Sequence, residues 1–156
     1  MAPDTRTVFG QATFRLMPND DFSTGPTEAR ITELSLGAFS ISYSWAHPQD
    51  GKQYGQLLIG APHEESKIVT VGWVDTWHQK PHLQVFTGTA ETDSIKLEAN
   101  YIADWRWQIE LIGLSTDSPT MTFRNVVPES ALQQQPPSDT PIGAGPYDVS
   151  VFSWRS

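Results

Sequence analysis

Hydrophobic and polar side chains alternate along most of this chain. The clearest case is residues 39–47, where every odd position is large and every even position is a serine or alanine. Alternation with a period of two is typical of a β-strand with one buried face. Similar runs recur at intervals of about ten residues. The pattern predicts strands over 5–16, 27–36, 38–47, 53–60, 66–77, 82–90, 94–102, 105–113, 119–127 and 147–155.

Turn signals separate these runs, and no segment carries a sustained helical stripe. The sharpest signal is Asp50-Gly51, which lies between two alternating runs and indicates a hairpin. Consecutive short antiparallel strands form either a sandwich or a barrel, and a long meander tends to close and so remove its edges. We therefore expect an all-β fold: a single antiparallel up-and-down β-barrel of about 8–10 strands, with little or no helix, over one domain spanning 1–156.

Residues 128–146 form the one loop-like stretch, with five prolines and three consecutive glutamines. Proline donates no hydrogen bond to a strand ladder, so this stretch cannot be a central strand. We expect a surface loop that crosses one end of the barrel, with a lid as one option, before the last strand.

Composition narrows the function classes. Hydrophobic residues make up 38% of the 156 residues and charged residues 18%, which is typical of a globular protein. The net charge of −8 disfavours nucleic acid and anionic membrane surfaces, and the absence of cysteine excludes disulfides and thiolate nucleophiles. No apolar run reaches the roughly 18 residues that cross a bilayer, and no apolar signal region opens the chain, so we expect a cytoplasmic protein.

Several motifs in order resemble a known family. They are Gly-Gln-Leu-Leu-Ile-Gly (55–60), Trp-Val-Asp-Thr-Trp-His (73–78), Phe-Thr-Gly-Thr (86–89), Asp-Trp-Arg-Trp-Gln-Ile-Glu-Leu (104–111) and Phe-Arg-Asn-Val-Val-Pro-Glu (123–129). Together they resemble a bacterial family of lipocalin-like domains of unknown function, numbered 1579. The resemblance covers most of the chain and implies a calycin-type barrel, but it supplies no activity.

The chain is rich in aromatic residues, with six tryptophans. Such rings either fill a core or line a ligand cavity. Gly88 shares a strand face with Phe86, and a glycine there leaves room for a bound molecule. Asn125, on one face with Phe123, is a candidate for orienting a ligand. The ligand-lining candidates are Tyr43, Trp45, Trp73, Trp105, Trp107 and Asn125.

Asp75 is the strongest candidate for chemistry. It shares a strand face with Trp73 and Trp77, and a carboxylate between two indoles is desolvated, which raises its pKa and suits a general acid or base. His78 and Glu110 are the candidates to assist it. The alternative is that Asp75 caps the following turn. His78 and His82 also permit a metal site with Asp75, but the spacing is not diagnostic, and we expect neither a metal nor another cofactor.

Residues 105–111 leave two registers open. If the odd positions face inward, Trp105 and Trp107 line the interior while Arg106, Gln108 and Glu110 meet solvent. The reverse register makes Arg106 and Glu110 an internal ion pair, which is costly unless a polar ligand meets it. We therefore expect the first register.

Three functions follow from these patterns. The leading hypothesis is a binding module whose interior takes up a small hydrophobic or aromatic molecule. The second is an enzyme of the isomerase, dehydratase or cyclase type, with Asp75 transferring a proton. The third is a filled barrel that acts through its surface, and a homodimer stays open because alternation alone does not separate inside from outside.

Overall fold

Ten strands and one short helix make up the computed structural model, which describes residues 3–78 and 82–156. The strands are β1 (Asp4–Phe14), β2 (Ser23–Glu33), β3 (Phe39–His47), β4 (Gly51–Ile59), β5 (Ile68–Asp75), β6 (Gln84–Ala90), β7 (Ser94–Ile102), β8 (Trp105–Ile112), β9 (Thr120–Val127) and β10 (Gly145–Arg155). The helix α1 (Glu129–Leu132) is a single turn. All ten strands lie close to the segments that the alternation predicts.

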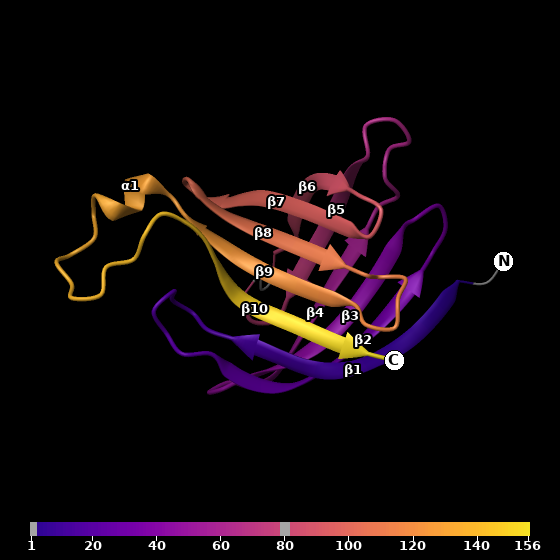
Figure 1. Ribbon diagram of the computed structural model, residues 1–156, viewed down its shortest axis with the longest axis horizontal. Coiled ribbons are helices and arrows are strands. Elements are labelled where there is room, and N and C mark those ends of the chain that lie inside the picture. Colours follow the sequence, from indigo (N-terminus) through magenta and orange to yellow (C-terminus); the bar gives the residue numbers. More distant parts are fainter. Residues whose placement is uncertain (1–2, 79–81) are drawn as a thin grey trace.

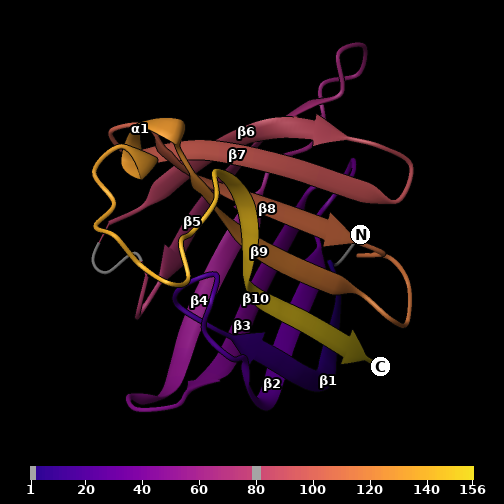
Figure 2. The same cartoon turned by 60° about the vertical axis from the view of Figure 1, so that its left-hand side comes forward.

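The strands form one closed antiparallel barrel. Each strand pairs with its neighbour in the chain, and β10 pairs with β1 to close the sheet (Figure 1, Figure 2). The prediction of an up-and-down β-barrel is confirmed, since closure leaves no unpaired edge. Among the described residues, no helix is long and apolar enough to cross a membrane.

The proline-rich loop defines one end of the barrel. It connects β9 to β10, projects from the barrel and carries α1 (Figure 1). Because the strands alternate in direction, the connections β1–β2, β3–β4, β5–β6 and β7–β8 lie at this same end, which we call the proline-loop end. Asn19 in the β1–β2 connection donates a hydrogen bond of 2.7 Å to the Thr140 carbonyl of the loop.

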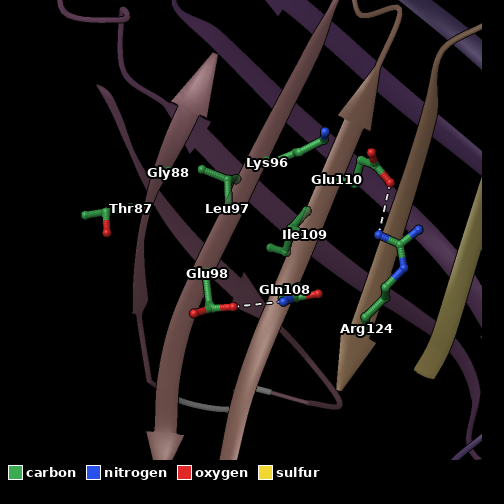
Figure 3. A pocket seen from close by; sticks show the side chains of 9 residues that line it. All are labelled: Thr87, Gly88, Lys96, Leu97, Glu98, Gln108, Ile109, Glu110 and Arg124. Carbon is green, nitrogen blue, oxygen red and sulfur yellow. Dashed lines mark hydrogen bonds and ion pairs between the residues drawn. The ribbon is translucent and has the colours of Figure 1, made fainter. Parts of the chain in front are cut away.

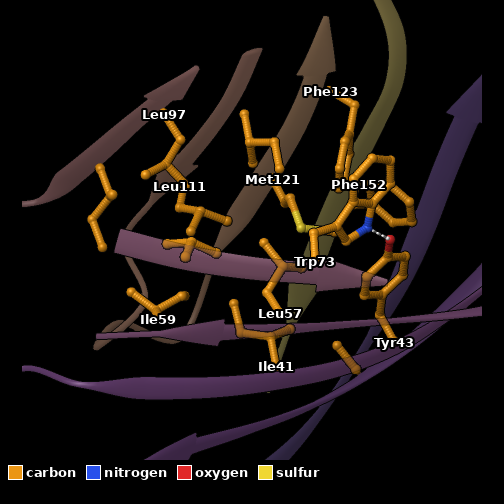
Figure 4. Close-up of a cluster of buried hydrophobic side chains, with 14 of the residues drawn as sticks. Ile41, Tyr43, Leu57, Ile59, Trp73, Leu97, Leu111, Met121, Phe123 and Phe152 are labelled. Atoms are coloured by element: carbon orange, nitrogen blue, oxygen red, sulfur yellow. Dashed lines mark hydrogen bonds between the residues drawn. The ribbon is translucent and has the colours of Figure 1, made fainter. Parts of the chain in front are cut away.

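The inner face of the barrel is graded from aliphatic to aromatic. Near the end opposite the proline loop it is filled by Ile41, Leu57, Ile59, Leu111 and Met121, which are all fully buried (Figure 4). Toward the proline-loop end the buried side chains become aromatic, with Tyr43, Trp73 and Phe123 packed ring against ring. Large aromatic rings carry polar N–H and O–H groups into this half of the barrel.

Gly88 serves the packing of strands and not a ligand. A Cβ atom at this position would lie 1.8 Å from the backbone carbonyl oxygen of Lys96 on β7. The expectation that Gly88 leaves room for a bound molecule is therefore wrong, because the neighbouring strand fills that space. A glycine in a strand interior is typical of such a close backbone approach.

We predict that Gly88→Ala lowers the free energy of unfolding by about 1–3 kcal/mol, because β6 and β7 must move apart. Gly143→Ala is the matched control, since nothing lies within 4 Å of a Cβ atom at Gly143. The control should change stability by less than about 0.5 kcal/mol. Urea unfolding of both variants measures this, and equal stabilities would contradict the close approach.

Candidate functional site

Asp75, the last residue of β5, is a buried carboxylate with only 4% of its surface exposed. Its Oδ1 accepts hydrogen bonds from the backbone amides of Trp77 (2.7 Å) and His78 (2.8 Å), and lies 3.2 Å from His78 Nδ1. Its Oδ2 accepts from the Tyr43 hydroxyl (3.1 Å) and from Trp45 Nε1 (3.3 Å). One carboxylate thus gathers donors from β3 and from the start of the β5–β6 connection.

The local sequence explains the hydrogen bonds that Oδ1 of Asp75 accepts. An aspartate commonly accepts from the amides two and three residues further on, which closes a turn at the end of a strand. The capping of the following turn by Asp75, one of the two alternatives, is confirmed. This turn also returns the His78 ring to the carboxylate.

A glycine makes the hydrogen bond from Tyr43 to Asp75 possible. Gly55 on β4 lies between Tyr43 and Asp75 in the strand register. A Cβ atom at Gly55 would lie 2.1 Å from Cζ of the Tyr43 ring. The missing side chain therefore lets the tyrosine lie across β4 and bring its hydroxyl to the carboxylate on β5.

The Tyr43 hydroxyl is held as a neutral donor. It accepts a hydrogen bond from Trp73 Nε1 (2.9 Å, Figure 4) and donates to Asp75. Burial raises the pKa of Tyr43 well above its ordinary value of 10.0, and the nearby charge of Asp75 raises it further. The phenol therefore keeps its proton and stabilises the carboxylate.

The expected rise in the pKa of Asp75 is wrong. Burial alone would raise this pKa, but the hydrogen bonds from His78 and from the amide of Trp77 outweigh burial and lower it below 3.8. A carboxylate has about four lone-pair positions, and five donors already occupy the two oxygens. Asp75 therefore anchors its neighbours and has no free position at which to exchange a proton with a ligand.

His78 lies inside a cage of aromatic rings, which we call the His78 box. Its side chain is only 8% exposed. The imidazole stacks on Trp45 at 5.4 Å between ring centroids and meets Trp77 edge-on at 4.8 Å. The rings that form the box are Phe14, Trp45, Trp73, Trp77 and Trp107.

One polar atom in the box is unsatisfied. Nε2 of His78 is buried and has no hydrogen-bond partner within the described part of the chain. Leaving a buried polar group unpaired costs about 1–3 kcal/mol, and folded proteins rarely keep one. Such an atom beside a fully engaged carboxylate is a candidate point of contact for a bound molecule.

A surface pocket adjoins the box. Its volume is about 590 Å³, and its wall includes Phe14, His47, Trp77 and the β1–β2 connection. The Trp77 ring stacks on His47 at 4.6 Å, and its Nε1 donates to the Asp50 carboxylate at 2.8 Å. Trp77 and Phe14 each contact both the pocket and His78, so these two rings stand between them.

A second polar group lies on the far side of Trp107. Tyr101 donates to the Asn125 side-chain oxygen at 3.0 Å, and Asn125 donates to the Tyr147 hydroxyl at 3.3 Å. Tyr147 in turn donates to the Leu16 carbonyl at 2.8 Å. Asn125 is therefore held by two tyrosines. Burial raises the pKa of both phenols.

Glu110 lies away from this site. The expected register of β8 is confirmed, and the side chains that face outward are Arg106, Gln108 and Glu110. Glu110 pairs with Arg124 at 2.9 Å, and Gln108 donates to Glu98 at 2.8 Å, around a shallow outer-face pocket of about 240 Å³ (Figure 3). The expectation that Glu110 assists Asp75 is wrong, because the wall of the barrel separates the two carboxylates.

The other predicted residues divide into two groups. Tyr43, Trp45, Trp73 and Trp107 are buried around Asp75 and His78, whereas Trp105 is half-buried. His82 is exposed, and no set of three metal-ligating side chains occurs among residues 3–78 and 82–156. Sequence reasoning placed Trp77 beside Asp75 but missed Phe14, His47, Tyr101 and Tyr147. Only the aromatic character of these residues hinted at a role, because their contacts span distant strands.

The fold and the site define a ten-stranded up-and-down β-barrel with a buried carboxylate–imidazole pair at one end. No protein-family model, curated protein or solved structure matches this chain. The resemblance to the lipocalin-like family numbered 1579 stays a prediction.

We predict that Asp75→Asn lowers the free energy of unfolding by about 3 kcal/mol at neutral pH, because the amide cannot accept from all five donors. The lowered pKa of Asp75 means that the carboxylate contributes its full stability above pH 3.8 and loses it as the pH falls through the folded-state pKa. The gap between wild type and variant should therefore narrow between about pH 5 and about pH 2.

Urea unfolding at several pH values measures this gap. Asp93→Asn is the matched control, because Asp93 is exposed in the β6–β7 turn. Its stability should stay within about 0.5 kcal/mol of wild type. A gap for Asp75→Asn that does not change down to about pH 2 would show that the carboxylate is not held as an anion.

Proposed function

We propose that this barrel binds a small, neutral, largely apolar or aromatic molecule at its proline-loop end, as a lipocalin-like binding module of the cytoplasm. The observation that carries the proposal is the buried, unpartnered Nε2 of His78 within a box of five aromatic rings. A ligand that supplies a partner for this atom recovers the cost of leaving it unpaired.

The size and lining of the adjoining pocket support this location. Ligand pockets commonly measure about 300–1,000 Å³ and combine aromatic walls with few polar groups. The pocket beside Trp77 falls within that range at about 590 Å³. The aliphatic half of the barrel is filled by its own side chains, so the ligand belongs at the end of the barrel.

The charges around the pocket favour a neutral ligand. Asp20 and Asp21 lie in its wall, and the whole chain carries a net charge of −8, which repels anions. Arg15 also lies in the wall, but its guanidinium donates to the carbonyls of Asp148 and Pro18. The carboxylates of Asp20 and Asp21 in the same wall outnumber this one cation.

Asp75 and His78 also support a second candidate, a proton-transfer enzyme of the isomerase, dehydratase or cyclase type. In this alternative His78 is the acid or base, and Asp75 is a positioning residue that holds its Nδ1. A histidine oriented by a carboxylate is a common arrangement for general acid–base catalysis. The roles of Asp75 and His78 are thus exchanged relative to the sequence-based hypothesis.

We predict that N-phenyl-1-naphthylamine, a neutral probe that fluoresces outside water, binds wild-type protein saturably. Trp77→Ala should weaken its binding by at least about tenfold, because the variant removes an indole that borders both the pocket and the box. Tyr54→Ala is the matched control, since Tyr54 is an exposed aromatic residue of β4. Fluorescence titration measures both. Binding that survives Trp77→Ala but is lost in Phe9→Ala would place the ligand in the outer pocket beside Phe9 and overturn the proposal.

The enzyme alternative predicts that the protein accelerates exchange of the activated C–H protons of phenylacetone, a neutral aryl ketone, with deuterium oxide. His78→Gln should reduce that acceleration by at least about a hundredfold, the usual contribution of a general base. Proton NMR follows the exchange. A rate equal to that of buffer alone would count against the enzyme and leave the binding module.

A further inference from the structure

We infer that His78 accepts a hydrogen bond from the ligand, so that the site selects planar aromatic molecules with a hydrogen-bond donor, such as a phenol hydroxyl, over their ethers and carboxylates. This inference rests on the proposed function and names the chemical class of its ligand. It follows from the contacts of Nδ1, from the donors around the box and from the rings that cover Nε2.

The contacts of Nδ1 determine what Nε2 offers. Nδ1 of His78 lies 3.2 Å from Oδ1 of Asp75, and an ionised carboxylate only accepts hydrogen bonds. The proton of the neutral imidazole therefore resides on Nδ1, and Nε2 carries a lone pair. This lone pair has no hydrogen-bond partner in the described part of the chain.

Four of the neighbouring donors are engaged. The Tyr43 hydroxyl and Trp45 Nε1 donate to Asp75, and Trp73 Nε1 donates to Tyr43. Trp77 Nε1 donates to Asp50. A ligand carbonyl or carboxylate would find no free N–H or O–H among these four groups, whereas a ligand O–H finds the lone pair of His78. A site with one unmet acceptor discriminates strongly for a donor, because the wrong ligand leaves that acceptor buried and unpaired.

The shape of the box favours a flat ring. Trp77 is the most exposed of the five rings around His78, and it stacks on His47 with an interplanar angle of 25°. Because Nε2 is covered, a ligand reaches it when a covering ring moves, and Trp77 is the more exposed of the two box rings that border the pocket. A planar molecule that enters as the Trp77 indole shifts stacks against that ring, with its edge toward His78.

The test compares two probes that differ by one methyl group, 2-naphthol and 2-methoxynaphthalene. Isothermal titration calorimetry at about pH 8, above the range in which free imidazole side chains titrate, gives their affinities. Wild-type protein should bind 2-naphthol at least about tenfold more tightly than the ether, and 2-naphthoate should bind more weakly than 2-naphthol.

Two variants of His78 separate the contribution of its hydrogen-bond acceptor from that of its flat ring. His78→Phe keeps a flat ring but has no acceptor, so the preference for 2-naphthol should disappear. His78→Gln keeps a carbonyl acceptor and should retain part of the preference, which also covers the case in which the phenylalanine variant fails to fold. Tyr101→Phe is the matched control, because Tyr101 lies beyond Trp107 and should leave the preference unchanged.

The outcomes are distinct for the two proposals. Equal binding of 2-naphthol and its ether by wild type would overturn the inference while the binding function stands. A preference that persists in His78→Phe would likewise overturn it, since another group would then accept the hydrogen bond. Failure of N-phenyl-1-naphthylamine and both naphthalene probes to bind would overturn the binding function itself, and the inference with it.

Discussion

The carboxylate of Asp75 is the interaction on which the proline-loop end of the barrel depends. Removing a carboxylate from water costs several kcal/mol unless hydrogen bonds replace the lost hydration. Five donors do so here, two side chains from β3, two backbone amides and one imidazole. The same bonds fix the positions of Tyr43, Trp45 and His78, so the charge organises the aromatic half of the interior.

The aliphatic half of the barrel is held together by apolar packing. There Ile41, Leu57, Ile59 and their neighbours pack without polar groups, and their burial supplies stability in the ordinary way. The two halves are built on the same strands, and glycines allow close contacts at particular positions. Gly55 gives way to the Tyr43 ring beside Asp75, while Gly88 lets two backbones meet.

Asp75 and His78 have different roles because the acceptor positions of the carboxylate are all occupied. A carboxylate that already accepts five hydrogen bonds has no position left for a ligand. It influences a ligand only by orienting the imidazole of His78. His78 keeps one nitrogen free in a dry aromatic setting, where a hydrogen bond is stronger than in water. Binding and proton transfer both make use of this atom, which is why one site supports two candidate functions.

The strands could be predicted from the sequence because the relevant physics is local. A period of two places Trp73 and Asp75 on one face whatever the rest of the chain does, and it also turns Glu110 away from Trp107. The capping role of Asp75 is local too, since the amides that it binds follow within three residues. Alternation, turn residues and the proline-rich loop thus determined the all-β class and the order of the elements.

The chemistry of the site was decided by the tertiary structure, because it depends on partners far away in the chain. The Oδ2 atom of Asp75 accepts its hydrogen bonds from Tyr43 and Trp45, which precede it by about thirty residues. The pocket beside Trp77 joins residues from β1 and β3, and the unpartnered nitrogen of His78 exists only once five rings from different strands enclose it. Period and spacing specify which face a side chain takes, whereas the closed barrel determines which side chains meet inside it.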